Sequence, residues 1–312
     1  MISISFIVNF LTSTLRLAIP LGFASLGEGF LERAGSVNLG LEGLMLFGAW
    51  GGVVGAHFSG SPWIGLALGI SVGILIAALE AVIIIYLHAN EVVVGVAINT
   101  LSLGITSYGY RVIFGISGPA VLVPTFERVS IPVLSKIPIL GPVLFNQPLL
   151  VYIQVIVAIA LLLILKKSSW GLDIRASGED PWVTEAEGGN VYRIRFLMYL
   201  LSGLLAACGG AFISLYNVSQ FFDGMTSGRG FIALAIVVIG RWNPLFILAA
   251  AVLFGGSEAL GLALQAKLGE NAPFQLLLII PFLITMIILP FASSGKSAPT
   301  ALGQGYTRGK GA

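Results

Sequence analysis

Long apolar runs separated by short polar or glycine-rich breaks fill most of the chain. A helix needs about 20 apolar residues to cross the hydrocarbon core of a bilayer, and stretches of this kind recur along the sequence. The runs are continuous rather than alternating, so they predict helices and exclude a β-barrel. The candidate spans are residues 5–27, 42–57, 62–87, 91–114, 148–166, 196–217, 229–241, 244–266 and 272–291, of which the seventh is short for a full crossing.

This pattern predicts an all-α polytopic membrane protein with about 8–10 transmembrane helices. Hydrophobic residues make up 57% of the 312 and charged residues only 10%, and the mean hydropathy is +0.99. Soluble domains contain about 45–50% apolar residues, so the composition excludes a soluble globular protein. Cys208 is the only cysteine and lies within an apolar run. A disulfide within the chain and a cysteine metal site are therefore excluded, and we expect no metal site.

Basic residues are concentrated in two segments, and these predict the orientation of the chain. The first segment carries Lys166, Lys167, Arg175, Arg193 and Arg195, and the second, after the last run, carries Lys296, Arg308 and Lys310. The positive-inside rule places both in the cytoplasm. Two cytoplasmic segments must be separated by an even number of crossings. Four candidate spans lie between them, so the number is even only if 229–241 crosses the membrane or a neighbouring span is broken instead. The N-terminus and the loop 115–147 are then outside.

We therefore expect one transmembrane domain over residues 1–292. It would include an external loop at about 115–147, whose many prolines favour a folded-back loop over a span. It would also include a cytoplasmic segment at about 166–195. Residues 293–312 are rich in Gly, Ser and Thr, which predicts a disordered cytoplasmic tail.

Two glycine-rich stretches do not have the pattern of plain spans. In ERAGSVNLGLEGLMLFGAWGG (Glu32–Gly52) the glycines weaken a helix, while Asn38 and Glu42 bring polarity into or near the bilayer. Charged residues there usually face a cavity or a partner. We expect a broken helix, in which Ser36 or Asn38 caps a new helix whose first turn holds Glu42. The alternative is a tight loop whose small residues serve helix packing.

The second stretch, FFDGMTSGRGFIALAIVVIGRWNP (Phe221–Pro244), joins a polar entry that includes Arg229 to a short apolar run. Two short, glycine-interrupted segments at comparable places in the two halves are typical of an inverted-repeat transporter. The repeat would relate roughly 1–114 to 148–291. Other intramembrane polar residues either line the route of a polar solute or pair between helices, among them Glu80, Asn99, Asn217 and Glu258. The glycines at 65, 69 and 73 are better assigned to helix packing.

The segment RASGEDPWVTEAEGGNVYRIR (175–195) is a dense polar island in this apolar chain. It contains no His, no Cys and no paired metal-ligand spacing, so nothing in it looks catalytic. Asp180 before Pro181 predicts an N-cap followed by a proline at the first helical position. Gly188 and Gly189 would end this helix after about two turns. A short capped helix between two spans suits docking to another protein, and the alternative is a solvated connecting loop.

The island resembles the cytoplasmic coupling segment of ABC-importer permeases of the branched-chain amino acid, ribose and nucleoside superfamily. Gly178, Glu179, Pro181, Ala186 and Gly188 match that segment, and aspartate stands at position 180, where asparagine is usual. SVNLGLEGLMLFGA (36–49) is similar to the broken membrane segment of the same permeases, in the form of the nucleoside branch. GRGFIALAIVVIGRWNP (228–244) again resembles the nucleoside and simple-sugar branch.

This resemblance implies one transmembrane subunit of an ABC importer in the bacterial cytoplasmic (inner) membrane, with membrane lipid around it and no role for nucleic acid. Its implied partners are a separate ABC ATPase, an extracytoplasmic solute-binding protein and a second permease, which we expect to be a paralogue in a heterodimer. ATP and Mg would be bound by the ATPase, so this chain needs no cofactor and is no enzyme. The ATPase-coupling residues would be Gly178, Glu179, Asp180, Pro181, Thr184, Glu185, Ala186 and Gly188. The substrate-pathway residues would be Asn38, Glu42, Asn99, Asn217 and Arg229.

The expected solute is a small polar molecule, with a nucleoside favoured over a simple sugar or a branched-chain amino acid. A different class remains open from the residues alone. Glu42, Glu80 and Glu258 could carry protons or sodium ions in an ion-coupled secondary transporter. A membrane-embedded enzyme is disfavoured, because the predicted spans hold no His/Asp, Ser/Lys or metal-spaced set.

Overall fold

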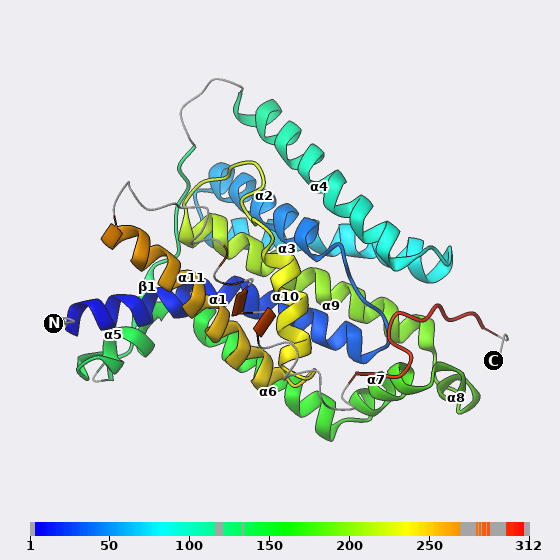
Figure 1. The fold of residues 1–312 in the computed structure, drawn as a ribbon. Coiled ribbons are helices and arrows are strands. Elements are labelled where there is room, and N and C mark those ends of the chain that lie inside the picture. The colour runs from blue at the N-terminus through cyan, green and yellow to red at the C-terminus, as the bar shows by residue number, and fades with distance from the viewer. Residues whose placement is uncertain are drawn as a thin grey trace.

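A computed structural model describes residues 4–115, 121–132, 134–268 and 298–308, together with residues 279, 281, 283, 284, 286 and 287. The ninth predicted span, 272–291, falls outside the described residues apart from those isolated positions. The described chain is almost wholly helical (Figure 1). This confirms the prediction of an all-α polytopic membrane protein.

The helices and strands follow one another in a simple order along the chain. They are α1 (Ile4–Arg33), α2 (Leu41–Ser59), α3 (Pro62–Ala81) with the π-helical turn η1 (Val82–Tyr86), α4 (Glu91–Phe114), β1 (Arg128–Ser130), the 3₁₀ turn η2 (Leu134–Lys136), α5 (Leu140–Leu144), β2 (Asn146–Pro148), α6 (Leu149–Lys167), α7 (Ser169–Glu179), α8 (Pro181–Ala186), α9 (Val191–Phe212) with the π-helical turn η3 (Ile213–Asn217), α10 (Arg229–Ile239) and α11 (Pro244–Leu268). β1 and β2 pair antiparallel within the region predicted as an external loop.

Within the described residues, six helices are long and apolar enough to cross a membrane. They are Ser5–Arg33, Pro62–Tyr86, Glu91–Phe114, Leu149–Lys167, Val191–Asn217 and Pro244–Ala266. α10 has 11 residues and is therefore only about 16 Å long, half of a crossing. α1 continues to Arg33, six residues beyond the predicted end at 27, because the carboxylates that end the apolar run are bonded inside the protein.

α1 and α9 lie against each other at the centre of the bundle, and each also packs on two helices of the other half. α9 packs on α2 and α3, whereas α1 packs on α10 and α11. The central helix of each half thus packs on helices of the opposite half, which is the contact pattern that an inverted repeat produces. The repeat itself stays a prediction.

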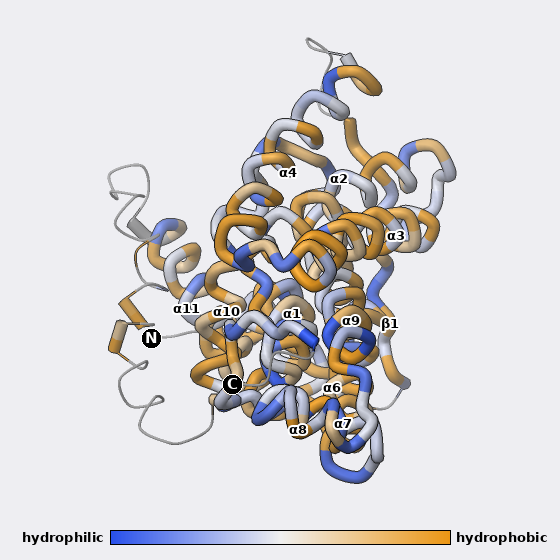
Figure 2. Tube along the Cα trace, turned by 90° about the vertical axis from the view of Figure 1, so that its right-hand side faces the viewer, coloured by the Kyte–Doolittle hydropathy of each residue, from blue (hydrophilic) through white to orange (hydrophobic). Residues whose placement is uncertain are grey.

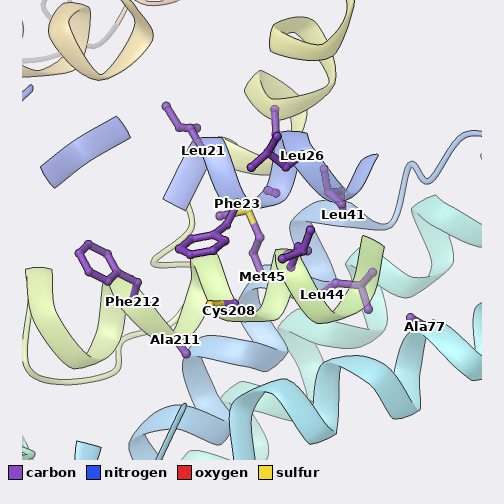
Figure 3. Packing of buried hydrophobic residues seen from close by; sticks show 14 of the residues in the cluster. Leu21, Phe23, Leu26, Leu41, Leu44, Met45, Ala77, Cys208, Ala211 and Phe212 are labelled. Atoms are coloured by element: carbon purple, nitrogen blue, oxygen red, sulfur yellow. The ribbon is translucent and has the colours of Figure 1, made fainter. Parts of the chain in front are cut away.

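The centre of the bundle is filled by apolar side chains from these helices. Figure 3 shows Phe23 and Leu26 of α1 beside Met45 of α2, with Cys208 and Phe212 of α9 on the same cluster. α2 and α3 approach closely through glycines: a methyl group at Gly55 would lie 2.9 Å from the Cα of Gly65, and one at Gly51 would lie 3.0 Å from the Cα of Gly69. The prediction that these glycines serve helix packing is confirmed.

The outer surface remains apolar, as a bilayer requires. Leu75 on α3 is 68% exposed and Ile156 on α6 is 65% exposed, and hydrophobic positions continue over the outside of α3 in Figure 2. Short elements lie at the two ends of the bundle (Figure 1). α5 and β1 lie at the end that carries the N-terminus, and α7, α8 and the C-terminal residues lie at the opposite end (Figure 1).

Candidate functional site

The chain between α1 and α2 is non-helical although it lies inside the bundle. We call residues 34–40 the break segment. Its backbone groups are bonded to side chains of distant helices: the amide of Val37 donates to Glu91 at 3.0 Å, and the amide of Asn38 donates to Glu28 at 2.8 Å. Irregular backbone is tolerated at membrane depth only where the protein itself satisfies it, and these carboxylates do so.

Carbonyl groups of the break segment are satisfied in the same way. The hydroxyl of Tyr199 on α9 donates to the Val37 carbonyl at 3.2 Å. The Ala34 carbonyl accepts from Arg195 Nε at 3.2 Å and from Ser177 Oγ at 3.1 Å. The break segment is therefore tied to α1, α4, α7 and α9 at once.

The N-terminus of α10 meets the first turn of α2 at Glu42. The carboxylate of Glu42 accepts from the amides of Gly228 at 2.8 Å and Gly230 at 2.6 Å. A helix N-terminus carries unpaired amides and partial positive charge, so a carboxylate is the natural partner. A methyl group at Gly230 would lie 2.5 Å from the Cα of Glu42, and glycine is what permits this approach.

Asn99 on α4 bridges the start of α2. Its side-chain oxygen accepts from the amide of Gly43 at 2.8 Å, and its side-chain nitrogen donates to the Leu39 carbonyl at 2.8 Å. One amide side chain thus bonds both the last part of the break segment and the first turn of α2. The new helix starts at Leu41 with Gly40 at the N-cap and no side-chain cap.

The predicted caps of α2 were therefore wrong, while the placement of Glu42 in its first turn is confirmed. Asn38 does not cap the helix, because its side-chain oxygen accepts from the amide of Gly40 at 2.8 Å. Ser36 lies two residues further from the helix start. The carboxylate of Glu42 and the bridge from Asn99 together hold the helix start that a cap would otherwise hold.

Arg229 at the start of α10 is paired rather than free. It forms an ion pair with Glu258 on α11, and its guanidinium also donates to the Met225 carbonyl at 3.2 Å. The structure thus brings Asn38, Glu42, Asn99 and the Arg229 backbone into one region around the break. The fifth predicted pathway residue, Asn217, ends the π-helical turn η3 and, in the described part of the chain, shares no hydrogen bond with the other four.

Sequence reasoning missed several residues that hold the break. Glu28 also accepts from Ser202 Oγ at 3.1 Å, and Glu32 accepts from the indole of Trp242. Glu80, which the sequence already singled out as an intramembrane polar residue, is fully buried beside Asn38 and Gly40. The spacing of Glu28 and Glu32, one helical turn apart, was the available signal.

Among the residues that the structure describes, no group of three or more His, Cys, Asp or Glu side chains could hold a metal ion.

The polar island folds as two consecutive short helices, α7 and α8. Asp180 caps α8, accepting from the amides of Trp182 and Val183 at 3.0 Å each, with Pro181 as the first helical residue. Gly188 has a φ of +91° and stops the helix in a left-handed conformation that favours glycine. The local prediction for α8 is confirmed, whereas α7 was not predicted.

α7 and α8 rest on the break segment from one side and leave another side open. A side chain at Gly178 would collide with the Arg33 carbonyl, so α7 lies directly on the end of α1. On α8, Pro181 and Thr184 are buried, whereas Val183, Ala186 and Glu187 are exposed along one face. Val183 is 54% exposed, which leaves an apolar position at the tip of the island for a partner.

Residues 298–308 differ from the disordered tail that their composition predicts, because they bond to this island. The Ala301 amide donates to the Gly178 carbonyl at 2.9 Å, and the Gly303 amide donates to the Gly35 carbonyl at 3.1 Å. Tyr306 is buried and donates its hydroxyl to Glu185, and Arg308 pairs with the same carboxylate at 2.6 Å. Burial and the adjacent Glu185 raise the pKa of Tyr306 to about 12, so the hydroxyl stays a donor at neutral pH.

Comparison with known proteins identifies what this architecture serves. A family described as "Branched-chain amino acid transport system / permease component" matches residues 10–289. The chain belongs to this family. It is therefore the permease subunit of an ABC importer, a multi-pass protein of the inner membrane rather than an enzyme, and permeases of this kind work with an ATPase and a solute-binding protein. The resemblance found in the sequence motifs is confirmed.

Curated relatives match the permease over almost its whole length. The guanosine ABC transporter permease protein NupQ of Bacillus subtilis is 36% identical, with 96% of each chain covered. A putative glucose ABC transporter permease protein of Haloferax volcanii is 34% identical over 97% of this chain and 99% of the relative. The nucleoside ABC transporter permease protein NupC of Lactococcus lactis is 33% identical over 93% and 94%.

Proposed function

We propose that this permease forms half of the translocation pathway for a nucleoside, with its N-terminus outside and its C-terminus in the cytoplasm. Two of the relatives described above are named for guanosine or nucleosides. Two charged groups near the break are already engaged within the protein, since Arg229 pairs with Glu258 and Glu42 accepts two amides of α10, and this supports an uncharged solute. A nucleoside offers donors and acceptors without a net charge and suits such a lining.

The single observation that carries the coupling mechanism is the attachment of α7 to the break segment. Ser177 and Gly178 contact Ala34, Arg33 and Gly35. We propose that the ATPase docks on α8 and that its closure on ATP and Mg moves α7 and the break segment together. The residues that we propose for this coupling are Gly178, Glu179, Asp180, Pro181, Thr184, Glu185, Ala186 and Gly188.

Motion of the break segment would be passed to the two half-helix starts. Asn38, Glu42 and Asn99 stand at the N-terminus of α2, and Glu42 holds the N-terminus of α10. We propose that Asn38, Glu42, Asn99, Asn217 and Arg229 border the solute route. Separation of α10 from Glu42 would expose amide donors to a solute hydroxyl or base edge.

The second permease in the complex is proposed to be a paralogue. Two guanosine ABC transporter permease proteins of Bacillus subtilis match this chain to different degrees, NupQ at 36% and NupP at 25% identity. The glucose permease proteins of Haloferax volcanii differ in the same way, at 34% and 26%. In each pair one permease is more similar to this chain than the other. This supports a heterodimer in which the present chain corresponds to the more similar permease.

Uptake by the reconstituted importer tests the proposal. The permease, its paralogue and the ATPase are placed in liposomes loaded with ATP, the binding protein is added outside, and uptake of labelled guanosine, glucose and leucine is compared. We expect ATP-dependent uptake of guanosine only. Preferred uptake of glucose or leucine would overturn the assignment of the solute, and uptake by this chain alone under a proton or sodium gradient would overturn the coupling to ATP.

A further inference from the structure

A cavity of about 330 Å³ lies beside the break segment, away from the proposed solute route. Its walls come from Ser36 of the break segment, from η1 and the residues that lead from it into α4, from the start of α9 and from the tail residues 303–307. Its volume is within the range of small-molecule sites. None of the five proposed pathway residues lines it, so the route does not account for it.

The buried side chain of Arg195 contributes to the lining of this cavity. Arg195 is 4% exposed. Its Nε donates to the Ala34 carbonyl at 3.2 Å and its Nη1 to the Gln304 carbonyl at 3.1 Å. Nη2 has no hydrogen-bond partner in the described chain. Ser36, beside Glu91, lines the same cavity. A buried donor left unpaired is unfavourable, so this guanidinium beside the cavity favours a ligand there that offers an acceptor.

The remaining walls indicate what kind of ligand fits. The rings of Tyr192 and Tyr306 lie 5.4 Å apart between centroids, and His88 lies 6.2 Å from Tyr192. Flat rings of this kind suit an aromatic base. Glu91 supplies an acceptor in the same cavity and disfavours an anion, so that donors, an acceptor and aromatic walls together match a neutral nucleoside.

We propose that this cavity is a second nucleoside site, which the transported solute enters from the cytoplasm after release. The assignment of the ligand rests on the proposed function. Its position links it to coupling, because Tyr306 both lines the cavity and holds Glu185 on α8. A bound nucleoside fastens the tail to the break segment and restrains α8, so that uptake slows as the cytoplasmic nucleoside accumulates.

Gly305 gives a matched pair of variants for the test. It lines the cavity, and a methyl group added there would meet no atom within 4 Å. Gly305→Trp is designed to occlude the cavity, while Gly305→Ala adds only a methyl group at the same position. The complete importer is reconstituted in liposomes loaded with ATP and either no nucleoside or millimolar unlabelled guanosine. For each variant, the initial rate of labelled guanosine uptake is measured with and without guanosine inside the liposomes. The ratio of the two rates measures inhibition by internal guanosine.

We expect loaded guanosine to reduce the rate at least threefold in the unaltered protein and in Gly305→Ala, and to leave the rate of Gly305→Trp unchanged. Equilibrium binding of labelled guanosine to the solubilised permease pair, without binding protein or ATPase, should weaken at least tenfold in Gly305→Trp and severalfold in Ser36→Ala. Equal inhibition of all variants, or no inhibition of the unaltered protein, overturns the second site while guanosine uptake still supports the proposed function. Absence of guanosine uptake instead overturns the proposed function.

Discussion

Removal of the Glu42 carboxylate should loosen the contact between the two half-helices. Glu42 accepts two backbone amides of α10, at 2.8 and 2.6 Å, and a hydrogen bond to a charged group contributes about 1.5–3 kcal/mol. Glu42 and Gly228 are only partly buried, so the lower value applies to each bond. Glu42→Ala should therefore cost about 3 kcal/mol, and Glu42→Gln about half of that, since its amide oxygen replaces one acceptor.

Thermal unfolding of the solubilised permease measures this effect. With an unfolding entropy of about 2.1 cal/mol/K per residue, each kcal/mol lowers the melting temperature of a 312-residue chain by roughly 1.5 °C, so Glu42→Ala should melt about 4–5 °C lower. Glu127→Ala is the matched control, because Glu127 is exposed in the external loop. A shift below about 1 °C for Glu42→Ala, or equal shifts for Glu42→Ala and Glu127→Ala, would refute the assigned role of the contact.

Three further predictions concern the island and the helix packing. Glu185→Lys places a positive charge next to Arg308 and should uncouple ATP hydrolysis from uptake. Arg308→Ala is the control, because it removes a largely exposed partner and should change both rates little. A normal ratio of uptake to ATP hydrolysis in Glu185→Lys would contradict this prediction. Asp180→Ala should lower stability by about 1 kcal/mol through loss of the α8 cap, and Asp180→Asn should retain it; equal melting of the two variants argues against the cap. Gly55→Leu should prevent assembly of α2 on α3, whereas Gly104→Leu, where added atoms meet open space, should yield folded protein by gel filtration.

Local patterns were enough to predict the elements whose structure is set by neighbouring residues. Asp180, Pro181 and Gly188 determine α8 through an N-cap, a first-turn proline and a left-handed glycine, all within nine residues. The short helix α10 followed from the length of its apolar run, and Glu42 was placed in the first turn of α2 although the predicted caps were wrong. Resemblance of these motifs to known permeases then gave the family.

Long-range contacts account for what the sequence did not reveal. Hydropathy ended the first span before Glu28 because a carboxylate lowers the mean, yet this carboxylate is buried by bonding to the Asn38 amide and to Ser202, 174 residues away. The tail residues 298–308 have a composition typical of disorder, but Tyr306 and Arg308 find Glu185 about 120 residues earlier in the chain. No local pattern encodes either partner.

The irregular backbone at residues 34–40 explains why the coupling signal can reach two helices at once. In a helix, the carbonyls of Ala34 and Val37 would bond to amides four residues ahead and would have nothing to offer other elements. Because the break leaves them open, α7 reaches Ala34 through Ser177, α9 reaches Val37 through Tyr199, and α4 reaches Leu39 through Asn99. The glycines that weaken the helix in this segment therefore allow α4, α7 and α9 to bond to its backbone. A substitution that restored helix across the break would stabilise the segment locally and still abolish coupling.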